Sequence, residues 1–478
     1  MRAYVVMRYV GVTLVVLAGV MFLMLIYSLA VDDGAWSIFC YSGLMAALTG
    51  ILPILFGPRE RQLSEREGYS VVVYAWLFIC FFGMAPYILY GDPFDFAGAW
   101  FESASGFTTT GATIVAELET LPKSMLMYRA LTHWVGGMGV VVFVLLVLPS
   151  LGRARMTLSR SEISWIARQD FQQRTGKILE QMGVVYLGLT LAAVLALLVC
   201  NVPLFDAFTM AFSTVSTGGF APNSLSSAAY SSALVEGVLA FFMVLSCLHL
   251  GLLYGLARGS WKAFFRSRVV RFFVALLGLS VMVVAVNIHY SMGKAWWTSF
   301  REGGFMVVSF MTTTGFASAD ANAWPQLSKL MLMLLAVVGG CSGSTTGGIK
   351  VDRLVVIVAS LRAYVGRLVH PQGVIRARVG REMISDELVN STFVFVTSFF
   401  VLALAHSVFV MLLGFDFVTA SSTSLACISN SGPGFGMLSS FDSYALFPDV
   451  ARVSYGALMI LGRLEIFGLL MVVLPKRI

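Results

Sequence analysis

The chain has 478 residues, of which 58% are hydrophobic and only 12% are charged. Soluble domains carry about 25% charged residues, so this composition excludes an ordinary soluble protein and predicts one that crosses a membrane. A net charge of +7 would suggest a nucleic-acid partner in a soluble protein. We predict no such partner here, because the basic residues gather in loops between apolar segments.

Ten apolar segments are long enough to cross a bilayer, which takes about 20 residues per helix. They lie at residues 8–30, 36–57, 69–90, 125–148, 178–200, 232–257, 269–290, 327–364, 391–413 and 452–474. The first segment is too long for a signal peptide and has no clear cleavage site, so we expect it to stay as a membrane span. The sequence thus predicts an all-α integral membrane protein.

The spans group into an N-terminal two-helix hairpin and four later repeats. The hairpin covers residues 1–68, and the repeats cover residues 69–152, 176–259, 267–368 and 388–478. We expect each repeat to consist of a helix, a pore loop and a second helix, arranged with pseudo-symmetry around a central pore. The second helix of the third repeat is expected to be broken.

Basic residues collect on one side of the predicted membrane. They lie in the loops at residues 59–66, 153–177, 258–271 and 362–381, and at Lys476 and Arg477. Loops rich in Lys and Arg stay in the cytoplasm. The pattern therefore predicts a multi-pass membrane protein with both termini in the cytoplasm.

Four short glycine-centred strings follow the first helix of each repeat. They are Thr109-Thr110-Gly111, Ser216-Thr217-Gly218, Thr313-Thr314-Gly315 and Asn430-Ser431-Gly432, with glycines 107, 97 and 117 residues apart. One string alone is typical of ordinary helix packing. Four strings, evenly spaced and all on the outer side, predict a ring of backbone carbonyls that replaces the water of a cation, as in a potassium filter.

Short semi-polar segments, such as residues 97–107 and 207–215, precede the strings. They are too short to span a bilayer, so we expect half-membrane helices that protein buries. The partial negative charge at their C-terminal ends would favour a cation. Glu102 in the first of them either tunes the outer field or makes a structural bond. His133 begins a segment in which Gly136 and Gly139 are interpreted as positions of close helix contact.

The predicted span at residues 327–364 is interrupted by a polar stretch with five glycines, followed by a lysine. These are Gly339, Gly340, Gly343, Gly347, Gly348 and Lys350. Such a stretch cannot stay helical in lipid, and below a filter it is well placed to act as a gate. The alternative is a phosphate-binding loop, but that motif requires Lys directly after the second Gly, and here Ile349 intervenes.

Arg463 lies within the last apolar segment. A cation near the bilayer centre costs about 2.5–3.5 kcal/mol, and Glu465, two positions away, points to another side of a helix. Two interpretations stay open. Arg463 either forms an electrostatic barrier in a cation pore or makes a structural ion pair with another helix.

Together, the four strings, residues 133–139, the stretch 339–350 and residues 462–467 resemble the Trk/Ktr/HKT superfamily of potassium transporters, in its TrkH/TrkG-type membrane subunits. The resemblance covers essentially the whole chain. It implies K⁺ as the transported ion, no other cofactor, backbone K⁺ sites at the four strings, gating by the 339–348 loop and a barrier at Arg463. It also implies a homodimer with one pore per protomer, contact with membrane lipid and a cytosolic nucleotide-binding regulator of the TrkA type.

From these observations and the resemblance we predict a K⁺ uptake protein of the bacterial inner membrane that is not an enzyme. An H⁺- or Na⁺-coupled K⁺ symporter is the alternative. A purely structural membrane protein would have no reason to carry four aligned strings. The fourth string departs from the others at Asn430 and Pro433, which predicts a ring with unequal contributions.

Overall fold

The computed structural model describes residues 2–57, 63–150, 175–373, 375–380 and 382–466. Within these ranges the protein is helical apart from one antiparallel hairpin of two-residue strands, β1 (Arg378–Val379) and β2 (Glu382–Met383). The predicted all-α class is confirmed. The predicted boundaries of the hairpin and the four repeats stay a prediction.

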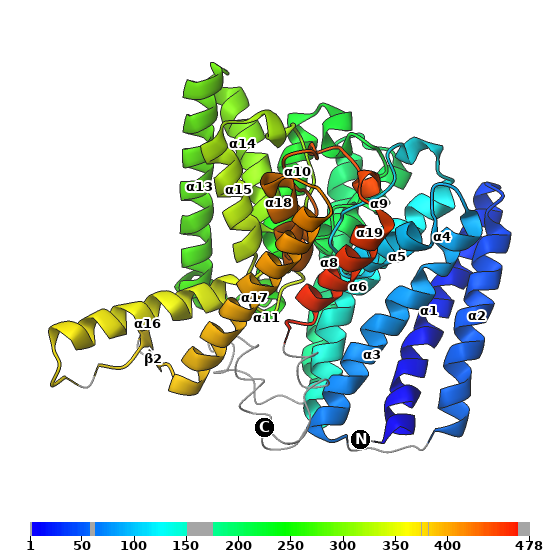
Figure 1. Ribbon diagram of the computed structural model, residues 1–478, viewed down its shortest axis with the longest axis horizontal. Coiled ribbons are helices and arrows are strands. Elements are labelled where there is room, and N and C mark those ends of the chain that lie inside the picture. The colour runs from blue at the N-terminus through cyan, green and yellow to red at the C-terminus, as the bar shows by residue number, and fades with distance from the viewer. Residues whose placement is uncertain (1, 58–62, 151–174, 374, 381, 467–478) are drawn as a thin grey trace.

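The helices fall into long spans, short half-helices and connecting pieces (Figure 1). The longer ones are α1 (Ala3–Val31), α2 (Trp36–Phe56), α3 (Glu65–Gly83), α6 (Lys123–Ser150), α8 (Thr175–Val199), α13 (Arg268–Met292), α16 (Val351–Val369) and α17 (Asp386–Leu412). The shorter ones are α4 (Ala85–Tyr90), α5 (Phe96–Phe107), α9 (Leu204–Val215), α10 (Ala233–Ser246), α11 (Leu250–Ala257), α12 (Trp261–Arg266), α14 (Trp296–Met311), α15 (Gln326–Val338), α18 (Phe417–Ser429) and α19 (Asp449–Arg463).

Among the described residues, six of the ten predicted spans are helices long and apolar enough to cross a membrane: α1, α2, α3 with α4, α8, α13 and α17. A seventh, α10 with α11, is bent by 105° at residues 247–249. The predicted break in the third repeat is confirmed, because α15 has only 13 residues. The total number of spans stays a prediction, because part of the predicted last span, residues 467–474, lies outside the described residues.

The N-terminal hairpin, α1 and α2, lies at one edge of the bundle (Figure 1). Its two helices approach closely where glycines face each other. A Cβ added to Gly50 would lie 2.7 Å from the carbonyl oxygen of Gly11. Small residues at such a crossing let two membrane helices come close enough for their backbones to touch.

The half-helices α5, α9, α14 and α18 each end directly before one of the predicted strings. The predicted segments 97–107 and 207–215 are confirmed as helices at 96–107 and 204–215. From Ala97 to Phe107 every residue of α5 except Trp100 is buried. Protein packing thus gives this short helix the shielding from lipid that it needs at membrane depth.

Two of these half-helices have aspartate caps at their first turn. Asp95 accepts a hydrogen bond from the backbone N–H of Gly98 at 2.6 Å, and Asp416 accepts one from Thr419 at 3.1 Å. Such caps satisfy N–H groups that the helix itself leaves free. They fix the residue at which α5 and α18 begin. The position of the string that follows each helix is set accordingly.

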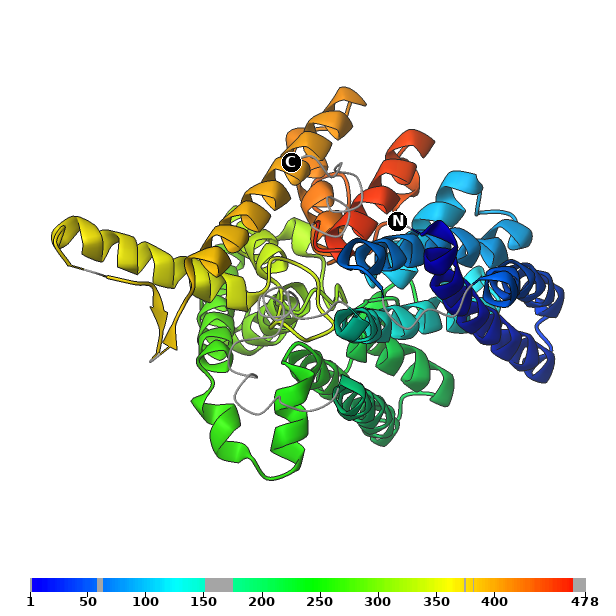
Figure 2. The ribbon, with the colours of Figure 1, turned by 90° about the horizontal axis from the view of Figure 1, so that it is seen from below.

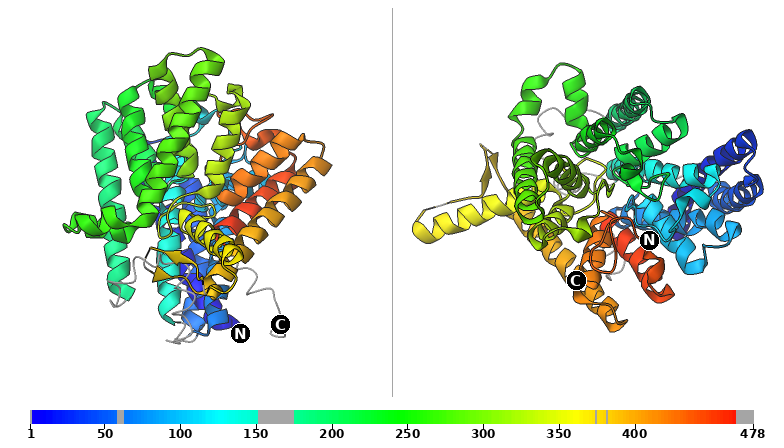
Figure 3. Two further views of the ribbon diagram at one scale, coloured as in Figure 1. Left: turned by 90° about the vertical axis from the view of Figure 1, so that its left-hand side faces the viewer. Right: turned by 90° about the horizontal axis from the view of Figure 1, so that it is seen from above.

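Viewed along the bundle, the helices surround a central region, and α16 projects away from it (Figures 2 and 3). α1 begins and α6 ends at the lower edge of Figure 1. The predicted basic loop at 153–174 and the pair Lys476 and Arg477 lie outside the described residues. Which side of the bundle faces the cytoplasm stays a prediction.

Candidate functional site

All four half-helices end in the same backbone turn. Two residues past α5, α9 and α14, and one past α18, a residue takes the left-handed conformation, with φ between 52° and 55°: Thr109, Thr217, Thr313 and Asn430. The N–H of the next residue donates to a carbonyl five residues back, at 2.8–2.9 Å in all four loops. This is the longer hydrogen bond of a Schellman helix end.

Three of these left-handed residues are threonines, which is unusual. A β-branched residue with positive φ is a genuine outlier, and it persists only where the surroundings impose it. Asn430 stands at the same position in the fourth loop, and asparagine takes this conformation more easily than most residues. The departure that the sequence showed in the fourth string is therefore a replacement that preserves the backbone geometry.

The loops that follow meet in a closed ring. The glycine of each loop has a φ between 82° and 88° and rests against a carbonyl of the next loop. The four contacts are Gly111 on Gly218, Gly219 on Thr314, Gly315 on Ser431 and Gly432 on Thr110. A Cβ added to Gly315 or to Gly432 would lie 2.6 Å from the carbonyl oxygen it faces, and the other two contacts are closer. Only glycine fits at these four positions.

The ring corrects the predicted alignment of the second string. Gly219, not Gly218, has the positive φ and the contact that Gly111, Gly315 and Gly432 have. Gly218 takes the place of Thr110, because its carbonyl receives the neighbouring glycine and its N–H donates to Ser213 at 2.8 Å. The match of Ser-Thr-Gly to Thr-Thr-Gly favoured the wrong glycine, and Ser216 corresponds to the residue before the other strings.

The glycine-rich stretch after α15, residues 339–348, lies against the C-terminal ends of the half-helices that precede the ring. The Thr345 hydroxyl lies 3.2 Å from both the Val215 carbonyl oxygen and the Thr217 hydroxyl. The N–H of Gly347 donates to the Thr313 hydroxyl at 3.0 Å. The stretch therefore contacts two of the left-handed threonines directly.

The stretch also contacts the fourth loop, and backbone hydrogen bonds join its last residues to the end of α15. A Cβ on Gly347 would collide with the carbonyl oxygen of Ser429, at the end of α18. The N–H groups of Ile349 and Lys350 donate to Val337 and Val338 at 2.9 and 2.8 Å. A helix, α15, precedes the stretch, so it lacks the strand that a phosphate-binding loop requires.

Two further backbone hydrogen bonds join the stretch to the bend between α10 and α11. Cys341 N–H donates to Cys247 at 3.0 Å, and Leu250 N–H donates to the Gly343 carbonyl at 3.2 Å. Gly339, Gly343 and Gly348 all have positive φ. The predicted glycines and Lys350 are thus brought together in one buried loop.

Arg463 ends α19 and is only 6% exposed. Its guanidinium donates to the carbonyl of Thr345 at 2.7 Å and to that of Gly136 in α6 at 3.3 Å. Within the described part of the chain it makes no ion pair; Glu465 instead pairs with Lys350, at 3.8 Å, and with Arg353. The interpretation of Arg463 as an ion-pair partner is therefore wrong for these residues, and it bridges the glycine-rich loop to α6.

Sequence reasoning missed Arg129 on α6. Its Nε lies 2.7 Å from Glu102 Oε1, and both side chains are at most 1% exposed. The structural bond considered for Glu102 is therefore present. No signal in the sequence pairs these residues, because 27 positions separate them and only the packing of α5 on α6 brings them together.

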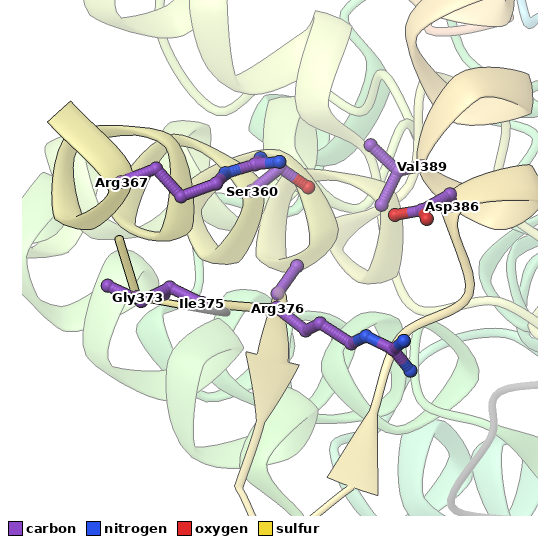
Figure 4. A pocket seen from close by; sticks show the side chains of 8 residues that line it. Ser360, Arg367, Gly373, Ile375, Arg376, Asp386 and Val389 are labelled. Carbon is purple, nitrogen blue, oxygen red and sulfur yellow. The ribbon is translucent and has the colours of Figure 1, made fainter. Parts of the chain in front are cut away.

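A cavity of about 220 Å³ lies beside α16 and β1, lined by Ser360, Arg367, Arg376 and Asp386 among others (Figure 4). It carries charges of both signs and sits where α16 leaves the bundle. It includes no residue of the predicted filter or gate.

Comparison with known proteins identifies the family. A profile of the family TrkH, described as a cation transport protein, matches residues 37–476. The chain belongs to the TrkH family. The predicted resemblance to TrkH/TrkG-type subunits is thereby confirmed, and so is the prediction that the chain is a transport protein and not an enzyme.

Relatives match this TrkH-family chain over most of its length. The Trk system potassium uptake protein TrkH of Salmonella typhimurium is 32% identical over 475 residues, 98% of each chain. TrkG of Escherichia coli K12 is 34% identical over 414 residues, covering 85% of this chain and 84% of TrkG. The crystal structure of the potassium transporter TrkH from Vibrio parahaemolyticus superposes with a TM-score of 0.90 at 27% identity, covering 100% of this chain and 99% of that one.

Proposed function

We propose that this protein carries K⁺ into the cell across the bacterial inner membrane, with the four-loop ring as its selectivity filter. The observation that supports this most directly is the closed cycle of glycine-to-carbonyl contacts among the four loops. Carbonyl rings of this kind replace the hydration shell of K⁺. The relatives' printed names, Trk system potassium uptake proteins, point the same way.

The proposed filter includes all the predicted residues and, in addition, Gly219. It comprises Thr109, Thr110, Gly111, Ser216, Thr217, Gly218, Gly219, Thr313, Thr314, Gly315, Asn430, Ser431 and Gly432. The C-terminal ends of α5, α9, α14 and α18 add partial negative charge toward the same region. The membrane potential supplies the driving force, about 2.3 kcal/mol per charge for each 100 mV.

The gate in this proposal is the loop that contains Gly339, Gly340, Gly343, Gly347 and Gly348. Its contacts with Thr217, Thr313 and Ser429 support a position directly under the filter. Lys350 would hold the loop's end and Arg463 its middle, and the Arg463 charge would repel a passing cation. Opening the path would then require the loop to leave these partners.

We further propose a homodimer with one pore per protomer, in contact with membrane lipid and with both termini in the cytoplasm. A cytosolic nucleotide-binding regulator of the TrkA type would dock on the basic loops and move the gate. The word "system" in the relatives' names supports more than one component.

The coupled symporter is the rival to a channel-like mechanism. A proton relay needs an ionisable group that is free to exchange protons within the membrane. Glu102, buried beside the ring, is held by Arg129 at 2.7 Å and is therefore poorly suited to relay protons.

Reversal potentials separate these mechanisms. The purified protein would be reconstituted into K⁺-loaded liposomes under opposed K⁺ and Na⁺ gradients. A reversal near the K⁺ equilibrium potential is expected. A reversal that follows pH, or Na⁺ at fixed K⁺, would replace the channel-like mechanism by coupled transport or weak selection, and absence of flux would remove transport through the ring altogether.

A further inference from the structure

The contact between the first and second filter loops differs from the other three. In the first, third and fourth loops, Thr110, Thr314 and Ser431 precede the filter glycine, but in the second loop Gly218 does. Two adjacent glycines, Gly218 and Gly219, have more conformational freedom than any other pair. At this contact, glycine meets glycine and neither residue has a side chain to hold it in place.

Helix α6 fills the space that the second loop leaves empty. A Cβ on Gly218 would collide with the imidazole of His133. The same imidazole stacks on Phe220, with ring centroids 4.0 Å apart, and its Nδ1 accepts a hydrogen bond from the Phe220 N–H at 3.4 Å. Phe220 directly follows Gly219, so α6 holds the second loop on both sides of its filter glycine.

Arg129, one helical turn before His133, joins this arrangement to the first loop. Its guanidinium carbon lies 4.0 Å from the centroid of the Phe220 ring. Its Nε donates to Glu102 at 2.7 Å and its Nη2 to the Thr113 hydroxyl at 3.1 Å. One guanidinium therefore contacts the chain that leaves the first loop and the chain that leaves the second.

Glu102 completes the connection to the first loop. Its carboxylate accepts hydrogen bonds from the Thr113 hydroxyl at 3.0 Å and from the Ile114 N–H at 3.0 Å. Thr113 is two residues past Gly111. The geometry suits Arg better than Lys, because the guanidinium is planar, stacks on rings and donates in several directions at once.

In the described structure, none of the other three contacts between loops has a fully buried ion pair, and the charged group found there is the part-buried Asp320 carboxylate, which accepts from the Ser440 N–H at 3.2 Å between the third and fourth loops. Neutral hydrogen bonds join each of the three contacts. Ser227 donates to the Ala317 carbonyl at 2.8 Å, Asn322 to the Gly436 carbonyl at 2.8 Å, and the N–H of Tyr444 to the Thr113 carbonyl at 2.7 Å. A buried, charge-assisted pair is stronger and more directional than these. The Arg129–Glu102 pair lies beside the contact between Gly111 and Gly218, where neither loop residue has a side chain.

We propose that Arg129 is a positioning residue for ion selection, which fixes the contact between the first and second filter loops. It does not touch the ion. It sets where the Thr110 and Gly218 carbonyls lie, and selection of K⁺ over the smaller Na⁺ depends on the placement and stiffness of such carbonyls. This inference rests on the proposed function of the ring as the filter.

The test compares K⁺/Na⁺ permeability ratios, from reversal potentials in liposomes, for the wild type and matched double variants. Arg129→Gln alone would leave Glu102 as a buried unpaired charge, so it is combined with Glu102→Gln. We expect the double variant to lower the ratio at least about tenfold, which corresponds to about 1.4 kcal/mol. Arg129→Lys keeps the charge but loses the planar guanidinium that stacks on the Phe220 ring. Its permeability ratio should fall between those of the wild type and the double variant.

The control is a second Arg–Glu pair that lies away from the ring. Arg301 and Glu236 join α14 to α10 through two hydrogen bonds of 2.8 Å, and Arg301 is partly exposed. Arg301→Gln with Glu236→Gln should keep the ratio within about twofold, since partly exposed pairs contribute little. Thermal unfolding of every variant in detergent monitors folding.

Each outcome decides something. A wild type without K⁺ preference overturns the proposed filter and this inference together. A selective wild type with an equally selective, folded Arg129→Gln/Glu102→Gln variant overturns this inference alone. If that variant does not fold, Phe220→Leu removes only the ring surface that Arg129 and His133 contact; a lower ratio supports the positioning role, and an unchanged one refutes it.

Discussion

Gly315→Ala is a minimal perturbation of the proposed filter. The new Cβ would lie 2.6 Å from the Ser431 carbonyl oxygen and 3.0 Å from Pro433 Cδ, whereas ordinary contacts begin at 3.4 Å. The Ser431 carbonyl must therefore retreat by about 0.8 Å, because a backbone atom and a proline ring cannot rotate away, and functional groups tolerate only about 0.5 Å. The φ of +83° at residue 315 adds about 1–2 kcal/mol of strain for any residue with a Cβ.

A carbonyl displaced that far no longer matches the others in the ring. We expect the K⁺/Na⁺ permeability ratio to fall at least about tenfold, a change of about 1.4 kcal/mol, while the protein still inserts and folds. The assay is the reversal potential in liposomes. Gly237→Ala in α10 is the matched control, because nothing lies within 4 Å of its added Cβ, and it should keep the wild-type ratio.

The same assay tests the corrected register of the second loop. Gly219→Ala meets the Thr314 carbonyl more closely than Gly315→Ala meets Ser431, so it should reduce selectivity at least as much. Wild-type selectivity in both variants, with folding intact, would refute the argument that these glycines hold the ring.

Three further predictions concern the gate and a half-helix. Arg463→Ala removes the 2.7 Å hydrogen bond to the Thr345 carbonyl, so basal K⁺ flux should rise severalfold; loss of folded protein instead would give the arginine a purely structural role. Gly347→Ala introduces a Cβ against the Ser429 carbonyl and should also raise basal flux by displacing the loop, whereas flux equal to wild type would contradict a loop lodged under the filter. Asp416→Ala removes the cap of α18 and should cost about 1 kcal/mol of stability, measured by thermal unfolding, and an unchanged unfolding temperature would show that the cap is dispensable.

Much of the site could be predicted because its signals are local in sequence. A half-helix that cannot span the bilayer, followed by a glycine string, recurs four times at similar spacing. The interruption at Gly339–Gly348 is equally visible, because no helix in lipid tolerates five glycines in ten residues. These features need no knowledge of tertiary packing.

The features that were missed or misplaced depend on packing between repeats. Ser216-Thr217-Gly218-Gly219 offers two glycines, and only the contact with Thr314 in the third loop decides which of them corresponds to Gly111. Arg129 could not be assigned to Glu102 from sequence, since 27 positions separate them and only the packing of α5 on α6 brings them together.

The strained threonines also link the proposed filter to the proposed gate. Thr217 and Thr313 hold the left-handed backbone that shapes the ring, and their hydroxyls contact Thr345 and the N–H of Gly347 in the loop below. Each such hydrogen bond contributes about 0.5–1.5 kcal/mol, comparable to the cost of the left-handed conformation. The loop proposed as the gate, in its observed position, therefore helps to keep the residues of the proposed filter in their strained geometry. If the gate moves away, those residues lose part of that support, so we expect opening and ion selectivity to be coupled rather than independent.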